Sequence, residues 1–226
     1  MEQAKTLKQE IWEKSKKHKE WSMVLTDYIS RPVAYLIARF TNLTPNQISI
    51  LSFILGLAGC YFLIRGGYQN TLIGASLAMA YNVLDMTDGI IARVKGKASR
   101  VGHWLDGILG FVLTPLLVIS LAIGLRNYLA LTLGLFAAIS YPLQYNLVYF
   151  FNAEVVNKNE KLGIPGKGKL EWTRYVYGIS LFYIALFVAA IADKTFWVLG
   201  FWAVFGNLYW MAIVMVQFLT IRKQQQ

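Results

Sequence analysis

Six long apolar stretches decide which folds are open to this chain of 226 residues. A helix needs about 20 apolar residues to cross the hydrocarbon layer of a bilayer, and each stretch is about that long. The stretches cover residues 46–66, 71–92, 102–125, 128–151, 174–192 and 195–220. Only 15% of the residues are charged, against about 25% in a typical soluble domain. The sequence therefore predicts an all-α integral membrane fold with six transmembrane helices and no soluble catalytic domain.

The residues before the first apolar stretch form a separate basic segment. Its lysines alternate with Leu7, Ile11, Trp12 and Trp21, a pattern typical of an amphipathic helix on an anionic membrane surface. A solvated basic tail is the alternative. Thr44 as N-cap and Pro45 at the first helical position predict where the first membrane helix begins. We expect an N-terminal amphipathic interfacial helix, a six-helix membrane domain and a short tail, over residues 1–45, 46–221 and 222–226.

Basic residues are distributed unequally between the two sides that six spans create. The side with both termini carries 19 of the 22 lysines and arginines, and the other side carries Arg65, Arg126 and Lys194. An excess of Lys and Arg marks the cytoplasmic side. We therefore expect both termini and the loops at 93–101 and 153–173 to be cytoplasmic. The charges that give the net +10 avoid the apolar stretches, which favours the lipid bilayer over nucleic acid as the partner.

Three acidic residues fall clearly inside apolar stretches: Asp85, Asp88 and Asp106. Charged groups are costly in a membrane and usually functional. Asp85 and Asp88 are three residues apart, so they share one helix face near the cytoplasmic end of the second stretch. Because the connection at 93–101 is short, we expect the second and third stretches to be antiparallel neighbours. Asp106, about one turn into the third stretch, then meets the other two carboxylates at one depth.

Three carboxylates in one place repel one another unless protons or a cation neutralise them. Oxygen ligands without His or Cys suit Mg²⁺ or Mn²⁺, and also Ca²⁺. Plain ion pairs with Arg93 and Lys95 are one alternative. The cation pathway of a transporter is another, although transporter sites lie near the membrane midplane rather than near one surface.

The residues around the carboxylates suit a phosphate-bearing ligand. Three small residues leave space beside the carboxylates on both helices: Gly89, Ala92 and Gly102. Four basic residues form a rim: Arg93, Lys95, Lys97 and Arg100. The combination of metal ligands, small residues and a basic rim fits a nucleotide pyrophosphate at the membrane surface.

The string Asp85-x2-Asp88-Gly89-x2-Ala92-Arg93-x8-Gly102-x3-Asp106 resembles the signature of the CDP-alcohol phosphotransferases. Six spans and an amphipathic N-terminal helix are also similar to that family's architecture. The resemblance implies transfer of a phospho-alcohol from a CDP-activated donor, often CDP-diacylglycerol, to an acceptor hydroxyl with release of CMP in phospholipid synthesis. It also implies a homodimer. The acceptor stays open among glycerol 3-phosphate, inositol or its phosphate, serine and choline.

The same resemblance assigns roles to residues. Asp85, Asp88 and Asp106 would hold one or two Mg²⁺ or Mn²⁺ ions against the donor pyrophosphate. Three residues would border the cytidine and its phosphates: Gly89, Ala92 and Arg93. With Gly102, Lys97 and Arg100, they make up the expected substrate site. Metal ions of this kind stabilise charge on the attacked phosphate and on the leaving group.

Gly110 departs from the family pattern, which has a fourth aspartate at this position that helps to bind metal and accepts the acceptor's proton. His103 lies seven residues earlier and hence on the same helix face, and a neutral imidazole can accept a proton near pH 7. A helix-start histidine that points to solvent is the alternative. A second explanation is that the acceptor needs little deprotonation, because a loose transition state forms its new bond late. A third is that the protein is a non-catalytic descendant that binds CDP-alcohols or lipid.

Two further predictions concern the loop at 153–173 and the first apolar stretch. The loop is rich in Gly and Lys. It either guides an anionic acceptor to the site or is a solvated basic loop. An intramembrane prenyltransferase would need a second acidic motif there, and the loop holds only Glu154, Glu160 and Glu171. In the first stretch, Gly56 and Gly59 are expected to let helices pack closely.

Overall fold

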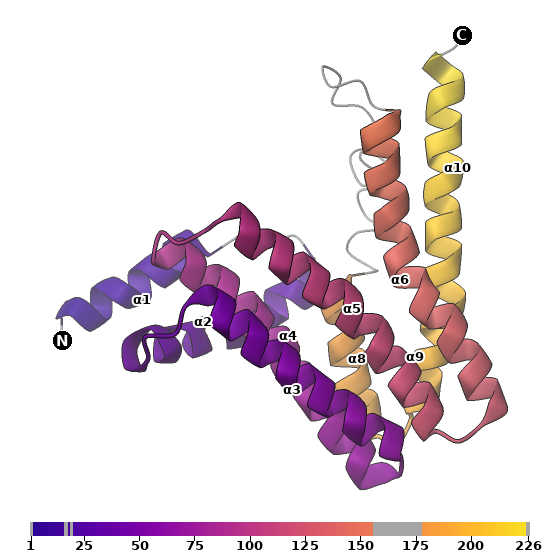
Figure 1. Ribbon diagram of the computed structural model, residues 1–226, viewed down its shortest axis with the longest axis horizontal. Helices are drawn as coiled ribbons and strands as arrows, with labels where there is room; N and C mark the ends of the chain where they lie inside the picture. Colours follow the sequence, from indigo (N-terminus) through magenta and orange to yellow (C-terminus); the bar gives the residue numbers. More distant parts are fainter. Residues whose placement is uncertain (1, 16–17, 19, 156–177, 225–226) are drawn as a thin grey trace.

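The computed structural model describes residues 2–15, 18, 20–155 and 178–224, and the regular elements among these residues are all helical (Figure 1). The all-α prediction is therefore confirmed for this part of the chain. Most of the predicted 153–173 loop and the start of the fifth apolar stretch lie outside the described residues. The elements are α1 (Glu2–Lys14), α2 (Trp21–Phe40), α3 (Pro45–Arg65), α4 (Tyr68–Val94), α5 (Arg100–Gly124), α6 (Tyr128–Glu154), α8 (Ile179–Ile191), α9 (Thr195–Phe201), a π-helical turn η1 (Trp202–Gly206) and α10 (Asn207–Gln224).

Among the described residues, three helical segments are long and apolar enough to cross a membrane: α3, α5 and the continuous run Thr195–Arg222. Helices α4 and α6 have 27 residues each, about 40 Å at 1.5 Å per residue, so their length also suffices. Their polar residues, such as Asp85 and Asp88 in α4 and Gln144 in α6, lower their hydropathy. Helix α8 has 13 described residues.

The N-terminal segment contains two helices where one was expected. Helix α1 ends at Lys14 and α2 begins at Trp21. The two tryptophans of the predicted amphipathic pattern therefore lie on different helices. On α1, Ile11 is only 2% exposed and packs into a small core with Ile48 of α3 and with Ile90 of α4. Helix α1 is thus attached to the rest of the protein through an apolar contact.

Helix α2 turns its polar face inward. Its buried residues include Ser22, Thr26 and Ser30, which recur every four residues and so share one face. The Ser30 hydroxyl donates to the Val83 carbonyl of α4 at 3.0 Å, and Asn82 Nδ2 donates to the Thr26 hydroxyl at 3.2 Å. The opposite face exposes large apolar residues: Trp21, Leu25, Tyr28, Ile29, Leu36 and Phe40.

Helix α3 is the common support of α4 and α5 (Figure 1). It begins with a capping box, in which the Thr44 side chain accepts from the Gln47 N–H and the Gln47 side chain accepts from the Thr44 N–H. The expected close packing is confirmed, because a Cβ at Gly59 would lie 3.0 Å from the Gly74 carbonyl oxygen of α4. Helices α4 and α5 contact each other only sparsely. The prediction of two directly packed antiparallel neighbours was therefore incomplete, since both helices pack mainly on α3.

Three connecting turns meet at the end of the fold remote from α1, and they hold the three basic residues assigned to the second side. Arg126 Nη2 donates to the Arg65 carbonyl at 3.4 Å, which joins the α3–α4 and α5–α6 turns. The Tyr68 hydroxyl donates to the Ile191 carbonyl at 3.4 Å. This bond joins the start of α4 to the end of α8, next to the α8–α9 turn that contains Lys194. Helices α6 and α10 pack side by side, as Figure 1 shows at its right.

Candidate metal centre

The structure brings the three predicted carboxylates together. Asp85 and Asp88 lie one turn apart on α4, and Asp106 lies in the second turn of α5. One carboxylate oxygen from each residue can be chosen so that all three oxygens lie within 4.8 Å of one another. Asp88 is only 5% exposed, and the other two are partly buried. The expected meeting of the three carboxylates is confirmed by this geometry.

The donor set fits a hard divalent cation. It consists of carboxylate oxygens alone, which Mg²⁺ and Mn²⁺ prefer. Within the described part of the chain, none of the three carboxylates forms an ion pair with Lys or Arg. Lys95 Nζ, one of the expected partners, instead donates to the Leu43 carbonyl at 3.1 Å. The alternative, in which the carboxylates form ion pairs with Arg93 and Lys95, is therefore not seen among the described residues. The negative charges are available to a cation.

Two hydroxyl groups that the sequence analysis did not predict lie at the carboxylates. The Ser49 hydroxyl of α3 donates to Asp88, and the hydroxyl of the buried Tyr81 lies beside Asp85. Tyr81 lies four residues before Asp85 on the same helix face, so its spacing was a usable signal. Ser49 is 39 residues away from Asp88, and no local pattern connects them.

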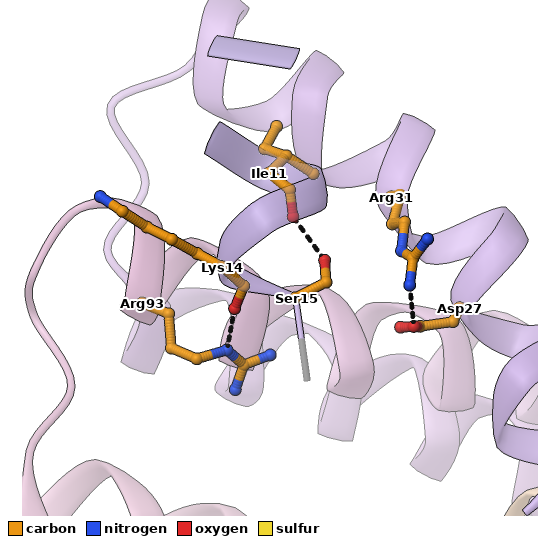
Figure 2. A network of polar contacts seen from close by, with 6 residues as sticks. All are labelled: Ile11, Lys14, Ser15, Asp27, Arg31 and Arg93. Carbon is orange, nitrogen blue, oxygen red and sulfur yellow. Dashed lines mark hydrogen bonds and ion pairs between the residues drawn. The ribbon is translucent and has the colours of Figure 1, made fainter. Parts of the chain in front are cut away.

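The motif arginine is directed toward the N-terminal helix (Figure 2). Arg93 Nε donates to the Lys14 carbonyl at 2.9 Å, and Lys14 Nζ reaches the Val94 carbonyl at 3.5 Å. A Cβ at Gly89 would lie 3.4 Å from Arg93 Nη1, so the glycine leaves space for the guanidinium. Burial lowers the pKa of Arg93 from its usual value, and the charges of Asp27 and Asp88 oppose this effect.

Figure 2 also shows, at its right, an ion pair between two residues of α2. Arg31 Nη2 and Asp27 Oδ2 of α2 form an ion pair at 2.7 Å, and the Arg31 guanidinium lies 4.2 Å from the ring centre of Trp12. Trp12 of the predicted amphipathic pattern is therefore a cation–π partner of α2.

The predicted rim runs from the last turn of α4, at Arg93, through the connection with Lys95 and Lys97 to Arg100 at the start of α5. The Ser99 hydroxyl caps this helix by accepting from the Gly102 N–H at 3.0 Å, and a Cβ at Gly102 would lie 3.1 Å from Asn46 Oδ1 of α3. Ala92 is half-buried, and Lys97 and Arg100 are exposed.

His103 is exposed one turn before Asp106. Its side chain makes no hydrogen bond to any residue in the described ranges. A Cβ added at Gly110, one turn after Asp106, would lie 3.6 Å from the Tyr81 hydroxyl oxygen. The structure therefore places Gly110 next to the carboxylate cluster and His103 at its outer edge.

The fold and the carboxylate cluster agree with the known proteins to which the chain is similar. Residues 42–221 match the CDP-alcohol phosphatidyltransferase family, and the chain belongs to that family.

Among curated proteins, a bifunctional IPC transferase and DIPP synthase from Aquifex aeolicus is 35% identical over 75 residues. An archaetidylinositol phosphate synthase from Pyrococcus horikoshii is 29% identical over 83 residues. The matched segments cover 33% and 37% of this chain but only 16% and 43% of those proteins.

The fold is similar to that of phosphatidylinositol phosphate synthase from Mycobacterium tuberculosis. Its crystal structure with CDP-DAG bound matches with a TM-score of 0.60 at 16% identity, over 84% of this chain and 94% of that one. Its apo form matches with a TM-score of 0.53 at 19% identity, over 81% and 95% of the two chains. At this level of identity the likeness shows a shared fold.

Proposed function

We propose that the protein is a CDP-alcohol phosphotransferase that moves a phospho-alcohol from a CDP-activated donor to an acceptor hydroxyl and releases CMP. The observation that carries this proposal is the cluster of Asp85, Asp88 and Asp106, with oxygens within 4.8 Å of one another, inside the region that matches the family. CDP-diacylglycerol is the donor that we favour, because the protein of similar fold was crystallised with CDP-DAG.

The residues of this chain perform separable tasks in the proposed reaction. The three carboxylates would hold one or two Mg²⁺ or Mn²⁺ ions, which supply positive charge to the pyrophosphate and the leaving group. Ser49 fixes Asp88 by donating to its carboxylate. Gly89, Ala92 and Gly102 would border the nucleotide, and a set of basic residues would attract its phosphates: Arg93, Lys97 and Arg100. Most of the catalytic effect then comes from positioning and electrostatics.

The acceptor's proton needs a destination, because position 110 has no carboxylate. His103 is the base that we propose, since it is the titratable residue of α5 one turn from Asp106. The donor's phosphate would lie between this edge of the site and the carboxylates. The late-bond explanation, in which no strong base is needed, predicts that His103 is dispensable.

The membrane arrangement that we propose has six spans, an N-terminal interfacial segment and a cytoplasmic active site. The outward apolar face of α2 supports the interfacial segment. The grouping of Arg65, Arg126 and Lys194 in turns at the end remote from α1 supports the orientation. The family resemblance adds a homodimer to this proposal.

The lack of a carboxylate at Gly110 favours a second function, which is the binding of a CDP-alcohol or a lipid without turnover. One assay separates the two: CMP release from CDP-diacylglycerol in the presence of Mn²⁺ or Mg²⁺, measured with a panel of acceptors. Inositol phosphate heads the panel because two similar proteins are named as inositol phosphate lipid synthases, followed by inositol, glycerol 3-phosphate, serine and choline. CMP release that depends on metal and on one acceptor supports the enzyme. Metal-dependent CDP-alcohol binding without CMP release supports the binding protein.

A further inference from the structure

The space beside Gly110 is occupied by a phenol from another helix. A Cβ at Gly110 would lie 3.6 Å from the Tyr81 hydroxyl oxygen, and among the described residues this is the one atom within 4 Å apart from the adjacent residues of the chain and the backbone of α5. Tyr81 lies on α4, so its side chain crosses the sparse contact between α4 and α5. The position that holds a carboxylate in the family pattern therefore faces a neutral hydroxyl here.

The same hydroxyl lies beside the Asp85 carboxylate, which follows Tyr81 by four residues on the same face of α4. A neutral phenol has one O–H to donate, and an ionised carboxylate only accepts. A hydrogen bond between the two groups would orient one of the three carboxylates of the cluster. One oxygen atom thus lies next to both the cluster and the place where a fourth acidic group would lie.

The Tyr81 ring is held in place independently of the carboxylates. It is 2% exposed, and its centroid lies 5.6 Å from that of Tyr183 on α8. The Tyr183 hydroxyl in turn lies 3.0 Å from the Thr114 hydroxyl of α5. Because residues of three helices hold the ring, the Tyr81 hydroxyl has a fixed place beside the cluster before any ligand binds.

We propose that Tyr81 is a positioning residue of the metal centre, whose hydroxyl holds Asp85 in its metal-binding orientation and takes the place of the fourth carboxylate. The inference rests on the proposed function only in requiring that the cluster binds a divalent ion. Groups that hydrogen-bond to metal ligands typically contribute 10–100-fold to metal affinity. The protein then binds its cation with three negative charges and one neutral hydrogen-bond donor.

The test is a Mn²⁺ titration of the full chain in detergent micelles, followed by the electron paramagnetic resonance signal of free Mn²⁺. Tyr81→Phe keeps the ring and removes the hydroxyl, and we expect it to raise the Kd for Mn²⁺ by about 10–100-fold. Tyr183→Phe is the matched control, because it removes a buried hydroxyl of the same aromatic cluster, the one paired with Thr114, and keeps the ring against which Tyr81 packs. Its Kd should stay within about twofold of the wild type. Thermal unfolding in EDTA reports on folding of both variants without metal.

Four results would overturn or separate the proposals. Equal Mn²⁺ affinity of the wild type and Tyr81→Phe overturns the role of Tyr81, as does an equal loss in both tyrosine variants. Absence of Mn²⁺ binding by the wild type overturns the metal centre itself. A selective loss in Tyr81→Phe, combined with no CMP release by the wild type, supports the positioning role and rejects only the proposed catalysis.

Discussion

Replacing Asp106 by Asn should make the protein more stable without metal and less responsive to metal. At 4.8 Å and an effective dielectric constant of about 20, two ionised carboxylates repel by about 3.5 kcal/mol. Three such pairs would cost roughly 10 kcal/mol, comparable to the whole free energy of unfolding of an ordinary domain, about 5–15 kcal/mol. The metal-free cluster is therefore a source of instability that a cation, or protons, must remove.

The substitution Asp106→Asn removes two of the three pairs, up to about 7 kcal/mol, and proton uptake by the wild-type cluster reduces this gain. In EDTA we expect the Tm of the variant to exceed that of the wild type. For a chain of this size, each kcal/mol gained in the free energy of unfolding raises the Tm by about 2–4 °C. On addition of Mn²⁺ the Tm of the wild type should rise and that of the variant should rise much less. CDP-alcohol binding by the variant should weaken by more than tenfold, or about 1.4 kcal/mol.

The assay is thermal unfolding in detergent, with EDTA or Mn²⁺, for the wild type and the variant. Asp193→Asn is the control, because Asp193 is an exposed aspartate in the turn after α8. Its φ of 54° is one that Asn also adopts readily. The control should leave both Tm values unchanged. A wild type whose Tm is the same in EDTA and in Mn²⁺, or an Asp106→Asn variant with a full Mn²⁺ response, would refute the reasoning.

Three further predictions concern the topology and the edge of the site. In a variant without the native cysteine, Lys97→Cys should react with an impermeant thiol reagent only from the cytoplasmic side and Lys194→Cys only from the opposite side; the reverse pattern would invert the proposed orientation. His103→Ala should lower CMP release by roughly 10²–10⁴-fold if His103 is the base, and Gly110→Asp should restore part of this loss; a fully active His103→Ala variant leaves the late-bond explanation. Ser49→Ala should raise the Kd for Mn²⁺ by about tenfold or more, because Asp88 loses its buried donor, and an unchanged Kd would show that Ser49 only packs.

Local patterns in the sequence predicted the parts of the molecule that depend on neighbours along the chain. Thr44 and Pro45 marked the start of α3 because a cap and a first-turn proline act within one turn. The convergence of Asp85, Asp88 and Asp106 followed from a three-residue spacing and a short connection. These features need no knowledge of how distant elements pack.

The features that the sequence did not reveal depend on contacts between distant elements. The bond from Ser49 to Asp88 exists because α3 lies against α4, and the bond from Arg93 to Lys14 exists because α1 folds back onto the site. The division of the N-terminal segment was missed because lysines dominate its first part. Their pattern obscured α2, whose polar residues face inward toward α4.

The docking of α1 has a practical consequence for where the protein can be cut or extended. The region that matches the family begins at residue 42, and a truncation at that boundary would look harmless in an alignment. It would nevertheless delete the Lys14 carbonyl that accepts from Arg93 and the Ile11 side chain buried against α3 and α4. Affinity tags and fluorescent fusions therefore belong at the C-terminus, because α10 ends away from α1 and α4 (Figure 1). The unit that has to be expressed to keep the site intact is larger than the unit that defines the family.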